Sequence, residues 1–378
     1  MKNIIRHKTA PDLLKDMLKI MAAISLAASP VYAEADRFIP ADDASLSFSD
    51  YARLTSIDSP FTPGQKMARG DRFIEIPTKG YEWDNPGMRC RFRTDAAEMR
   101  VHLYYSEKHC STSGRNPVGI YLIDGRHEAA WQFTSICQKA VRPPESVIVP
   151  ISAPSPGMHD YEIVLPYGDS VDVLGLSVNE KAHFETPAPR PKQRLVTIGD
   201  SITHGFNATV VSRSYAYLLA EKQKWQLVNM GIAGSSVSAK EGKLIASLEG
   251  DVVCVLSGVN AWQGGAPVEA YEENVQGFIR NLRAVQSSVP LVIITPLWVP
   301  PSWKPVKATI DLEKYRQTLR EVVRTMNDEN IHLVEGPDLI DHDEKYFDKV
   351  AVHPNDDGFA MMAERLANSL KDLQISRD

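Results

Sequence analysis

The sequence predicts an α/β domain preceded by an all-β domain, and three observations lead to this prediction. Residues 37–185 contain short alternating apolar runs separated by Gly, Pro, Asp and Asn, which is typical of a β-sandwich or jelly roll. Residues 194–378 alternate strand-like runs with helix-length amphipathic windows, which favours a parallel sheet with helices on both faces. Between them, residues 186–193 hold three prolines within five residues and predict a stiff, extended linker.

The N-terminus has the pattern of a secretory signal peptide. Lys15 and Lys19 precede an apolar run, Ile20–Ala28, that is too short to span a bilayer, and the small-residue pattern Val31–Ala33 follows. An N-terminal core helix is the alternative, but the Ser-Pro break and the polar residues that follow fit it poorly. We therefore expect residues 1–33 to be removed on export, and the protein to be secreted or periplasmic.

Composition argues against several partners. The 378 residues carry a formal net charge of −6, and the basic residues are scattered, so nothing in the charge favours nucleic acid or an anionic membrane surface. No CxxC pair or His/Cys cluster has the spacing of a zinc site, so we expect neither a metal nor another cofactor. The oligomeric state is left open.

The cysteines fall into two groups. Cys254 lies in the apolar run "VVCVL" and is expected to be a free, buried thiol. In an exported protein Cys110 and Cys137 could form a disulfide, and Cys90 competes for either partner. The sequence leaves this pairing open.

The α/β domain has five strand-like runs and four helical windows. The runs cover residues 194–198, 226–230, 251–258, 290–296 and 331–336. The windows are Tyr215–Lys222, Val268–Val285, Leu312–Met326 and Phe359–Leu373. Ligands of such sheets bind at the carboxyl ends of the strands, so the residues just after each strand are the candidates for function.

The first strand of this domain leads directly into "GDSITHG" (Gly199–Gly205). Ser201 stands where the strand gives way to a helix, and backbone N–H groups at a helix start favour negative charge. The serine is either a nucleophile or a helix N-cap, and this block alone does not decide between them.

Three further blocks place polar groups at the same edge. In "NMGIAG" the Gly234 N–H can approach an oxyanion unobstructed, and in "GVN" the Asn260 amide is another donor. In "HPND" His353 is the usual general base for a serine. Each block alone has an ordinary explanation, as a turn glycine, an Asx turn or a packed histidine. Their joint occurrence in this order indicates one site.

In these four blocks the sequence resembles the SGNH hydrolase superfamily, also called GDSL esterases, over about residues 194–373. The resemblance implies a flavodoxin-like three-layer fold with Ser201 as nucleophile and His353 as base. It also implies an oxyanion hole formed by the N–H groups of Ser201 and Gly234 and the Asn260 side chain.

By strand pattern and position, the β domain resembles the N-terminal modules of bacterial carbohydrate esterases in the same superfamily. This resemblance implies an exported enzyme that removes O-acetyl groups from a polysaccharide or oligosaccharide. Trp83 and Trp131 are candidates for stacking on sugar, and a purely structural domain is the alternative.

The catalytic acid is the main departure from the superfamily. Most members carry an aspartate three residues before the histidine, where this chain has Val350. The nearest upstream carboxylate is Asp348, so the site is either a triad completed by Asp348 or a Ser-His dyad. Ala261 replaces a second common aspartate without removing a catalytic atom.

Three side chains near the blocks are predicted to bind substrate. Trp262 and Trp298 would form an aromatic wall, with core packing as the alternative for both. His204, beside the nucleophile, either touches substrate or packs at the turn.

Other functions stay open at this level: a lipid esterase or lysophospholipase on the same core, acyl transfer between sugars, and an inactive carbohydrate-binding protein. Polar and aromatic residues around the blocks argue against the lipid esterase. The intact Ser201, Gly234, Asn260 and His353 argue against the binding protein.

Overall fold

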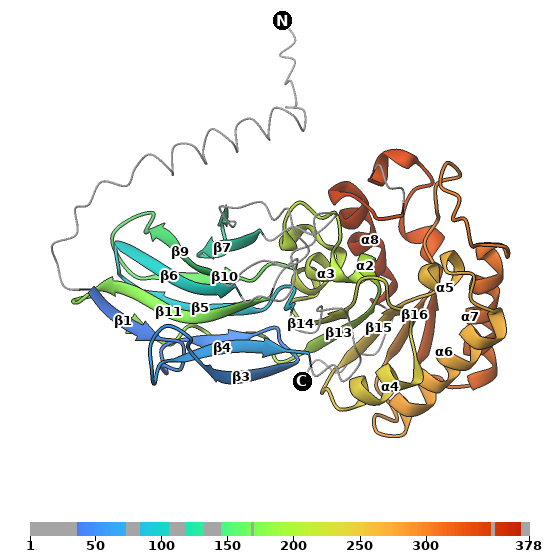
Figure 1. Cartoon of the computed structure of the whole chain (residues 1–378), viewed down its shortest axis with the longest axis horizontal. Helices are drawn as coiled ribbons and strands as arrows, with labels where there is room; N and C mark the ends of the chain where they lie inside the picture. Colours follow the sequence, from blue (N-terminus) through green and yellow to red (C-terminus); the bar gives the residue numbers. More distant parts are fainter. Residues whose placement is uncertain are drawn as a thin grey trace, which may run out of the picture. The chain divides into compact units, whose positions relative to one another are not determined.

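The computed structural model describes residues 36–72, 84–105, 118–131, 145–167, 170–348 and 352–371. The predicted signal peptide, Cys110, Cys137 and Trp83 lie outside these residues. Residues Arg37–Asp378 form one compact unit. Within it, two antiparallel sheets precede one parallel sheet in the chain (Figure 1).

The β domain consists of two six-stranded sheets that share one apolar core. The first has the order β3-β4-β11-β6-β9, with β1 paired to β11. Its strands are Asp36–Pro40 (β1), Arg53–Asp58 (β3), Lys66–Asp71 (β4), Glu98–Tyr105 (β6), Glu145–Ser152 (β9) and Val171–Asn179 (β11). The second has the order β12-β5-β10-β7-β8, with β2 paired to β5. Its strands are Ser47–Ser49 (β2), Arg89–Thr94 (β5), Gly119–Ile123 (β7), His127–Trp131 (β8), His159–Val164 (β10) and Phe184–Glu185 (β12). The predicted β-rich domain is thus confirmed.

The α/β domain is built on a five-stranded parallel sheet of order β14-β13-β15-β16-β17. Its strands are Arg194–Gly199 (β13), Gln226–Gly231 (β14), Val252–Leu256 (β15), Leu291–Ile294 (β16) and Ile331–Val334 (β17). Numbered within the domain this order is 2-1-3-4-5, the flavodoxin-like arrangement. The predicted α/β fold is therefore confirmed.

Both faces of the parallel sheet are covered, which explains why its strands are almost continuously apolar. Leu195 of β13 packs in a cluster with residues of α3 and α8, whereas Val196 packs with residues of α4, α6 and α7. The longer helices are Tyr215–Gln223 (α3), Ala239–Ala246 (α4), Val268–Arg283 (α6), Leu312–Met326 (α7) and Asp356–Ser369 (α8). The shorter ones are Ser201–His204 (α2), Val259–Gln263 (α5), Val211–Arg213 (η1), Gly336–Leu339 (η2) and Glu344–Tyr346 (η3).

All four predicted helices are present. One of them, α8, begins earlier than predicted, and the structure has a further eight-residue helix, α4, that was not predicted. Helix α8 begins at Asp356 instead of Phe359, because the Asn355 side chain caps it by accepting from the Gly358 N–H at 3.1 Å. Helix α4 was not among the predicted helices; it is capped by Ser238, whose hydroxyl accepts from a backbone N–H one turn later.

The linker between the domains is packed and does not act as a free spacer. Its Ala188 carbonyl accepts from Arg91 of the β domain at 2.9 Å, and its Arg190 donates to the Trp225 carbonyl at 3.1 Å. Beside it, Arg89 of β5, only 1% exposed, donates to Glu221 of α3 at 2.5 Å. Because these contacts are polar and largely buried, separating the two domains would leave charges without partners.

The described cysteines, Cys90 and Cys254, are both free and buried, as predicted for Cys254. Burial raises the pKa of the Cys90 thiol to about 12. Cys90 therefore does not compete for a disulfide, while the proposed Cys110–Cys137 pair lies outside the described residues. No helix in the described ranges is long and apolar enough to cross a membrane.

Candidate active site

The predicted site lies at the carboxyl edge of the parallel sheet. Ser201 follows β13, Gly234 follows β14, Asn260 follows β15, and His353 precedes α8. In the order 2-1-3-4-5, successive strands are added on one side of β13 and then on the other, so the strand order reverses between β13 and β15, and crevices at such switch points bind ligands. The fold thus places these loops where a ligand site is expected.

Ser201 is the first residue of α2, and its hydroxyl is not used for capping. The cap is Asp200, whose carboxylate accepts from the Ile202 N–H at 2.9 Å. The Ser201 Oγ instead lies 2.7 Å from the His353 Nε2. This distance is within the range needed for proton transfer between a nucleophile and its base.

Two glycines make the sharp turn at Ser201 possible. A Cβ on Gly199 would lie 2.3 Å from the Thr203 Oγ1 and 2.6 Å from the Leu256 carbonyl oxygen, so only glycine lets α2 pack this closely. Gly205, with φ of 110°, ends the helix after one turn and donates its N–H to the Ser201 carbonyl at 3.1 Å.

Three N–H groups are the predicted donors of the oxyanion hole. The Ser201 N–H is at the first position of α2, where it has no intrahelical acceptor. Gly234, with φ of 77°, is exposed, and within the described ranges its N–H donates to no acceptor. The Asn260 amide is held by two bonds: Nδ2 donates to the Ser235 carbonyl at 2.8 Å, and Oδ1 accepts from Gln263 at 2.5 Å. Its second N–H is left for a ligand.

The main chain and one aromatic ring hold His353. Its carbonyl accepts from the Asp348 N–H at 3.0 Å, and the adjacent residues Phe347 and Pro354 form a β-bridge. The Phe206 ring packs against the imidazole with centroids 5.6 Å apart and planes 35° apart.

The expectation that Asp348 completes a triad is not met by this geometry. In the described part of the chain, the Asp348 carboxylate makes no hydrogen bond to the His353 ring, because the two residues pair through their backbones. The contact that the structure shows is between Ser201 and His353, and the Asp348 charge raises the pKa of the imidazole.

Burial lowers the pKa of His353 to about 4, against the opposing effect of the Asp348 charge. The imidazole is therefore neutral at pH 7 and able to accept the Ser201 proton.

This low pKa of His353 predicts that the enzyme stays active at acidic pH. A base with an ordinary histidine pKa of about 6.5 is half protonated at that pH, whereas His353 stays neutral until the pH approaches about 4. Because the folded pKa is lowered, folding stability falls as the pH drops from about 6.5 towards the folded pKa. The acid limb of kcat/KM should thus be measured against the folded fraction from circular dichroism. A limb near pH 6.5 in folded protein would contradict the pKa argument.

Asp348→Asn is expected to lower kcat by less than about tenfold, because it removes a charge but no hydrogen bond to the ring. Loss of the carboxylate that orients the histidine in a true triad costs about ten-thousandfold. Steady-state kinetics of this variant beside wild type distinguish the two arrangements. A loss of a thousandfold or more would show that the carboxylate binds the imidazole during turnover.

His204 is placed in the interior, which corrects the prediction that it touches substrate. The residue is 0% exposed, and its Nε2–H donates to the Tyr167 carbonyl at 2.6 Å. The turn that exposes Ser201 directs this side chain, three residues later, away from the sheet edge into the protein. Its packing alternative is therefore the correct one.

The two predicted aromatic residues are half-buried and lie in separate pairs. Trp262 packs edge-on against Trp303 at 5.5 Å, and Trp298 stacks on His342 at 5.3 Å with planes 6° apart. Trp303 was missed, although it stands in the same Pro-rich segment as Trp298. Trp131 is only 7% exposed in the β-domain core and is not available to a sugar.

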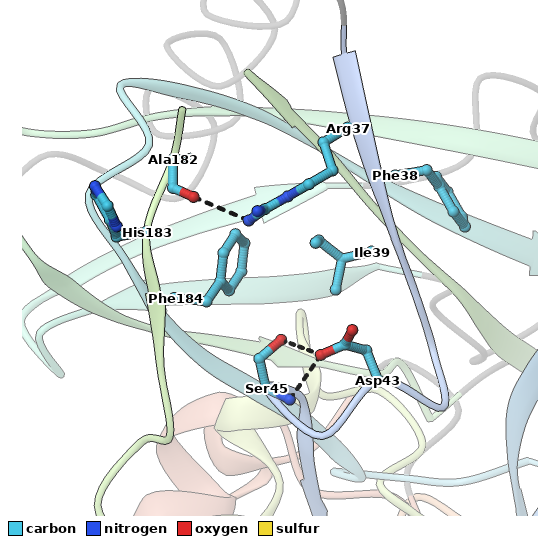
Figure 2. Close-up of a pocket in the computed structure, with 8 residues that line it drawn as sticks. All are labelled: Arg37, Phe38, Ile39, Asp43, Ser45, Ala182, His183 and Phe184. Carbon is cyan, nitrogen blue, oxygen red and sulfur yellow. Dashed lines mark hydrogen bonds between the residues drawn. The ribbon is translucent and has the colours of Figure 1, made fainter. Parts of the chain in front are cut away.

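A separate hollow of about 400 Å³ lies on the β domain, away from the predicted catalytic residues (Figure 2). Figure 2 shows Arg37 extending over the Phe184 ring and donating to the Ala182 carbonyl at 2.9 Å, while Asp43 accepts from Ser45. The guanidinium and the carboxylate thus already have partners within the chain. No group of three His, Cys, Asp or Glu residues in the described segments has a geometry that could hold a metal ion.

A buried serine in contact with a half-buried histidine at a strand edge is the arrangement of a nucleophile and its base in serine hydrolases. Residues 197–361 match the model of the GDSL-like Lipase/Acylhydrolase family. The chain therefore carries a carboxylic ester hydrolase domain. A comparison with curated proteins gave no match.

Solved structures similar to this chain span both domains. A salicylyl-acyltransferase from a tetracycline biosynthetic pathway aligns over 91% of this chain and 100% of its own, with 20% identity and a TM-score of 0.72. A family two carbohydrate esterase from Cellvibrio japonicus aligns over 89% and 98%, with 16% identity and a TM-score of 0.63. Another from Clostridium thermocellum, in complex with cellohexaose, aligns over 86% and 98%, with 15% identity and a TM-score of 0.59. Because these sequence identities are low, the comparison shows a shared fold.

Proposed function

We propose that this protein is an exported serine esterase that removes O-acetyl or similar short acyl groups from a polysaccharide or oligosaccharide. The observation that carries the proposal is the 2.7 Å contact between the Ser201 Oγ and the His353 Nε2. This contact supports a nucleophile paired with a neutral base, and the N–H groups of Ser201 and Gly234 and the Asn260 amide are the proposed oxyanion donors.

In the proposed reaction His353 accepts the Ser201 proton while the Oγ attacks the ester carbonyl carbon. The N–H groups of Ser201 and Gly234 and the Asn260 amide stabilise the oxyanion of the tetrahedral intermediate. Its collapse breaks the ester C–O bond, and His353 returns the proton to the leaving sugar oxygen. Water then attacks the acyl-enzyme carbonyl carbon while His353 accepts its proton. The bond from this carbon to the Ser201 Oγ breaks, His353 returns the proton to the Oγ, and the free acid leaves.

The choice of a carbohydrate ester rests on the side chains near the site and on the fold. Half-buried Trp262, Trp298 and Trp303 offer ring faces and edges, which suit the apolar faces of sugar rings. The likeness to two family two carbohydrate esterases supports the same choice at the level of the fold. Export rests on the signal-peptide pattern of residues 1–33, and N-terminal sequencing of the mature protein tests it.

The first test is acetate release from a panel of acetylated polysaccharides, oligosaccharides and simple acetyl esters. We expect release from at least one carbohydrate, with kcat/KM above that for long-chain acyl lipids. Preference for long-chain lipids would favour a lipid esterase. Transfer of acetyl to an added sugar hydroxyl in preference to water would favour a transferase. No release from any ester would overturn the proposal.

Asn260→Ala is expected to lower kcat about a hundredfold, because it removes one of three oxyanion donors. Asn281→Ala is the matched control, since the Asn281 amide also donates to a carbonyl, that of Ala239 at 2.7 Å, but lies on α6 away from the site. Steady-state kinetics on the best ester compare the two variants. Equal, small losses in both would remove Asn260 from the oxyanion hole.

A further inference from the structure

The β domain contacts the back of the nucleophile helix through a buried polar cluster. His204, the last residue of α2, donates its Nε2–H to the Tyr167 carbonyl at 2.6 Å, and the same nitrogen lies 3.3 Å from the Asp84 Oδ2. A carbonyl and a carboxylate both accept, so Nε2 carries the proton. Ser170 donates its hydroxyl to the other Asp84 oxygen at 3.3 Å. The end of α2 thus contacts two residues of the β domain, Tyr167 and Asp84, and Ser170 in turn holds Asp84.

Arg72 of the β domain extends this cluster to the strand that leads to the oxyanion loop. Its guanidinium is 1% exposed and donates from Nε to the Asp84 carbonyl and from Nη1 to the Gly231 carbonyl. Gly231 ends β14, three residues before Gly234. One buried side chain therefore connects Asp84 to the strand that carries an oxyanion donor.

The nucleophile helix rests directly on the residue that Arg72 holds. A Cβ on Gly231 would lie 2.4 Å from the His204 N and 2.6 Å from the Thr203 carbonyl carbon. Any displacement of Gly231 is consequently transmitted to α2. Asn229 of the same strand also donates to the Thr203 carbonyl at 2.8 Å, so α2 and β14 are held together at this point.

Helix α2 has only four residues, so its own hydrogen bonds do not fix its direction. Its orientation depends on contacts at both ends, and His204 supplies those at the C-terminal end. A shift of about 1 Å at a nucleophile can cost about a hundredfold in rate. Burying the Arg72 guanidinium and the Asp84 carboxylate costs desolvation energy that apolar packing would not, which argues that this cluster serves geometry.

We propose that Arg72 and Asp84 are positioning residues that fix the nucleophile helix and the oxyanion strand relative to each other, so that the β domain is needed for turnover. The proposal rests on the proposed esterase function. It assigns the β domain a role in catalysis although neither residue contacts the reacting atoms.

The test uses the full chain with Asp84→Asn, Arg72→Met and Arg72→Lys. Rates are expressed per active site, counted by complete labelling with a serine-directed fluorophosphonate. We expect Asp84→Asn and Arg72→Met to lower kcat about ten- to a hundredfold with KM within about twofold, and to slow labelling in parallel. Arg72→Lys should recover part of the loss, because the charge remains but the fork that bridges two carbonyls does not.

The control is a partly buried ion pair of the β domain that lies away from α2. Arg69 donates to Asp172 at 2.8 and 2.6 Å across neighbouring strands, and Asp172 is buried. Asp172→Asn should lower the melting temperature and leave kcat per labelled site unchanged.

The outcomes separate the inference from the function on which it rests. Wild-type kcat in folded Asp84→Asn and Arg72→Met, or an equal loss in Asp172→Asn, would overturn the inference and leave the esterase intact. A wild type that neither hydrolyses esters nor reacts with the fluorophosphonate would refute the proposed function itself. If the two stronger variants do not fold, Arg72→Lys and His204→Gln decide, since unchanged kcat in both would equally overturn the inference.

Discussion

Ser201→Ala is expected to lower kcat for ester hydrolysis about a thousandfold or more, with little change in KM. The hydroxyl lies 2.7 Å from the His353 Nε2, and without it no acyl-enzyme forms on this residue. The remaining donors still bind the substrate and polarise its carbonyl, so a small residual rate over water is expected. Acetate release over a long time course, with the variant purified separately from wild type, measures the loss.

The matched control is Ser247→Ala at the end of α4. Its hydroxyl donates to the Leu244 carbonyl at 2.6 Å and lies away from the sheet edge. We expect wild-type kcat for this variant. Retention of more than about a tenth of wild-type kcat in Ser201→Ala would mean that another group carries the reaction.

His353→Gln is expected to lower kcat by a similar factor, because a glutamine amide cannot accept the serine proton and return it to the leaving group. In subtilisin, loss of the nucleophile, of the histidine or of both costs about the same, so Ser201→Ala with His353→Gln should be no slower than either alone. Single and double variants assayed together measure this non-additivity.

His332→Gln serves as the control for the histidine, since His332 lies on β17 outside the proposed site. Its kcat should match wild type. If the effects of Ser201→Ala and His353→Gln instead multiply, the two residues act independently and the dyad account fails.

The blocks that carry the chemistry could be predicted because their roles depend on local order along the chain. A strand followed by Gly, Asp and Ser identifies the turn, and the parallel sheet then brings Gly234, Asn260 and His353 to the same edge. The start of α8 was misplaced because Asn355, a capping residue, was not read as a helix start. In each case the signal lies within a few residues of the feature.

Features that depend on distant pairs could not be predicted. His204 was expected near substrate because it is adjacent to Ser201 in sequence, whereas its position is set by Asp84 and Tyr167 of another domain. Arg72 and Gly231 are 159 residues apart, and neither has a local signal for their contact. The uncertain role of Asp348 had the same origin, since spacing does not show whether a side chain or a backbone meets His353.

The positioning role proposed for Arg72 and Asp84 also bears on the two-domain architecture. Structures similar to this chain align over both domains, so the β domain and the α/β domain occur together in each. A β domain that supports the nucleophile turn would explain in physical terms why the α/β domain is not used alone here.

Trapping the acyl-enzyme tests the central claim most directly. Wild-type protein is mixed with excess of its best acetyl ester, quenched in acid within the first turnovers, digested and analysed by mass spectrometry. The account predicts one acetyl group on the peptide that contains Ser201, and none in the Ser201→Ala variant. Two results would contradict it, each with acetate released at the full rate. One is an acetyl group on a residue other than Ser201. The other is no covalent intermediate in rapidly quenched samples together with no fluorophosphonate labelling of Ser201.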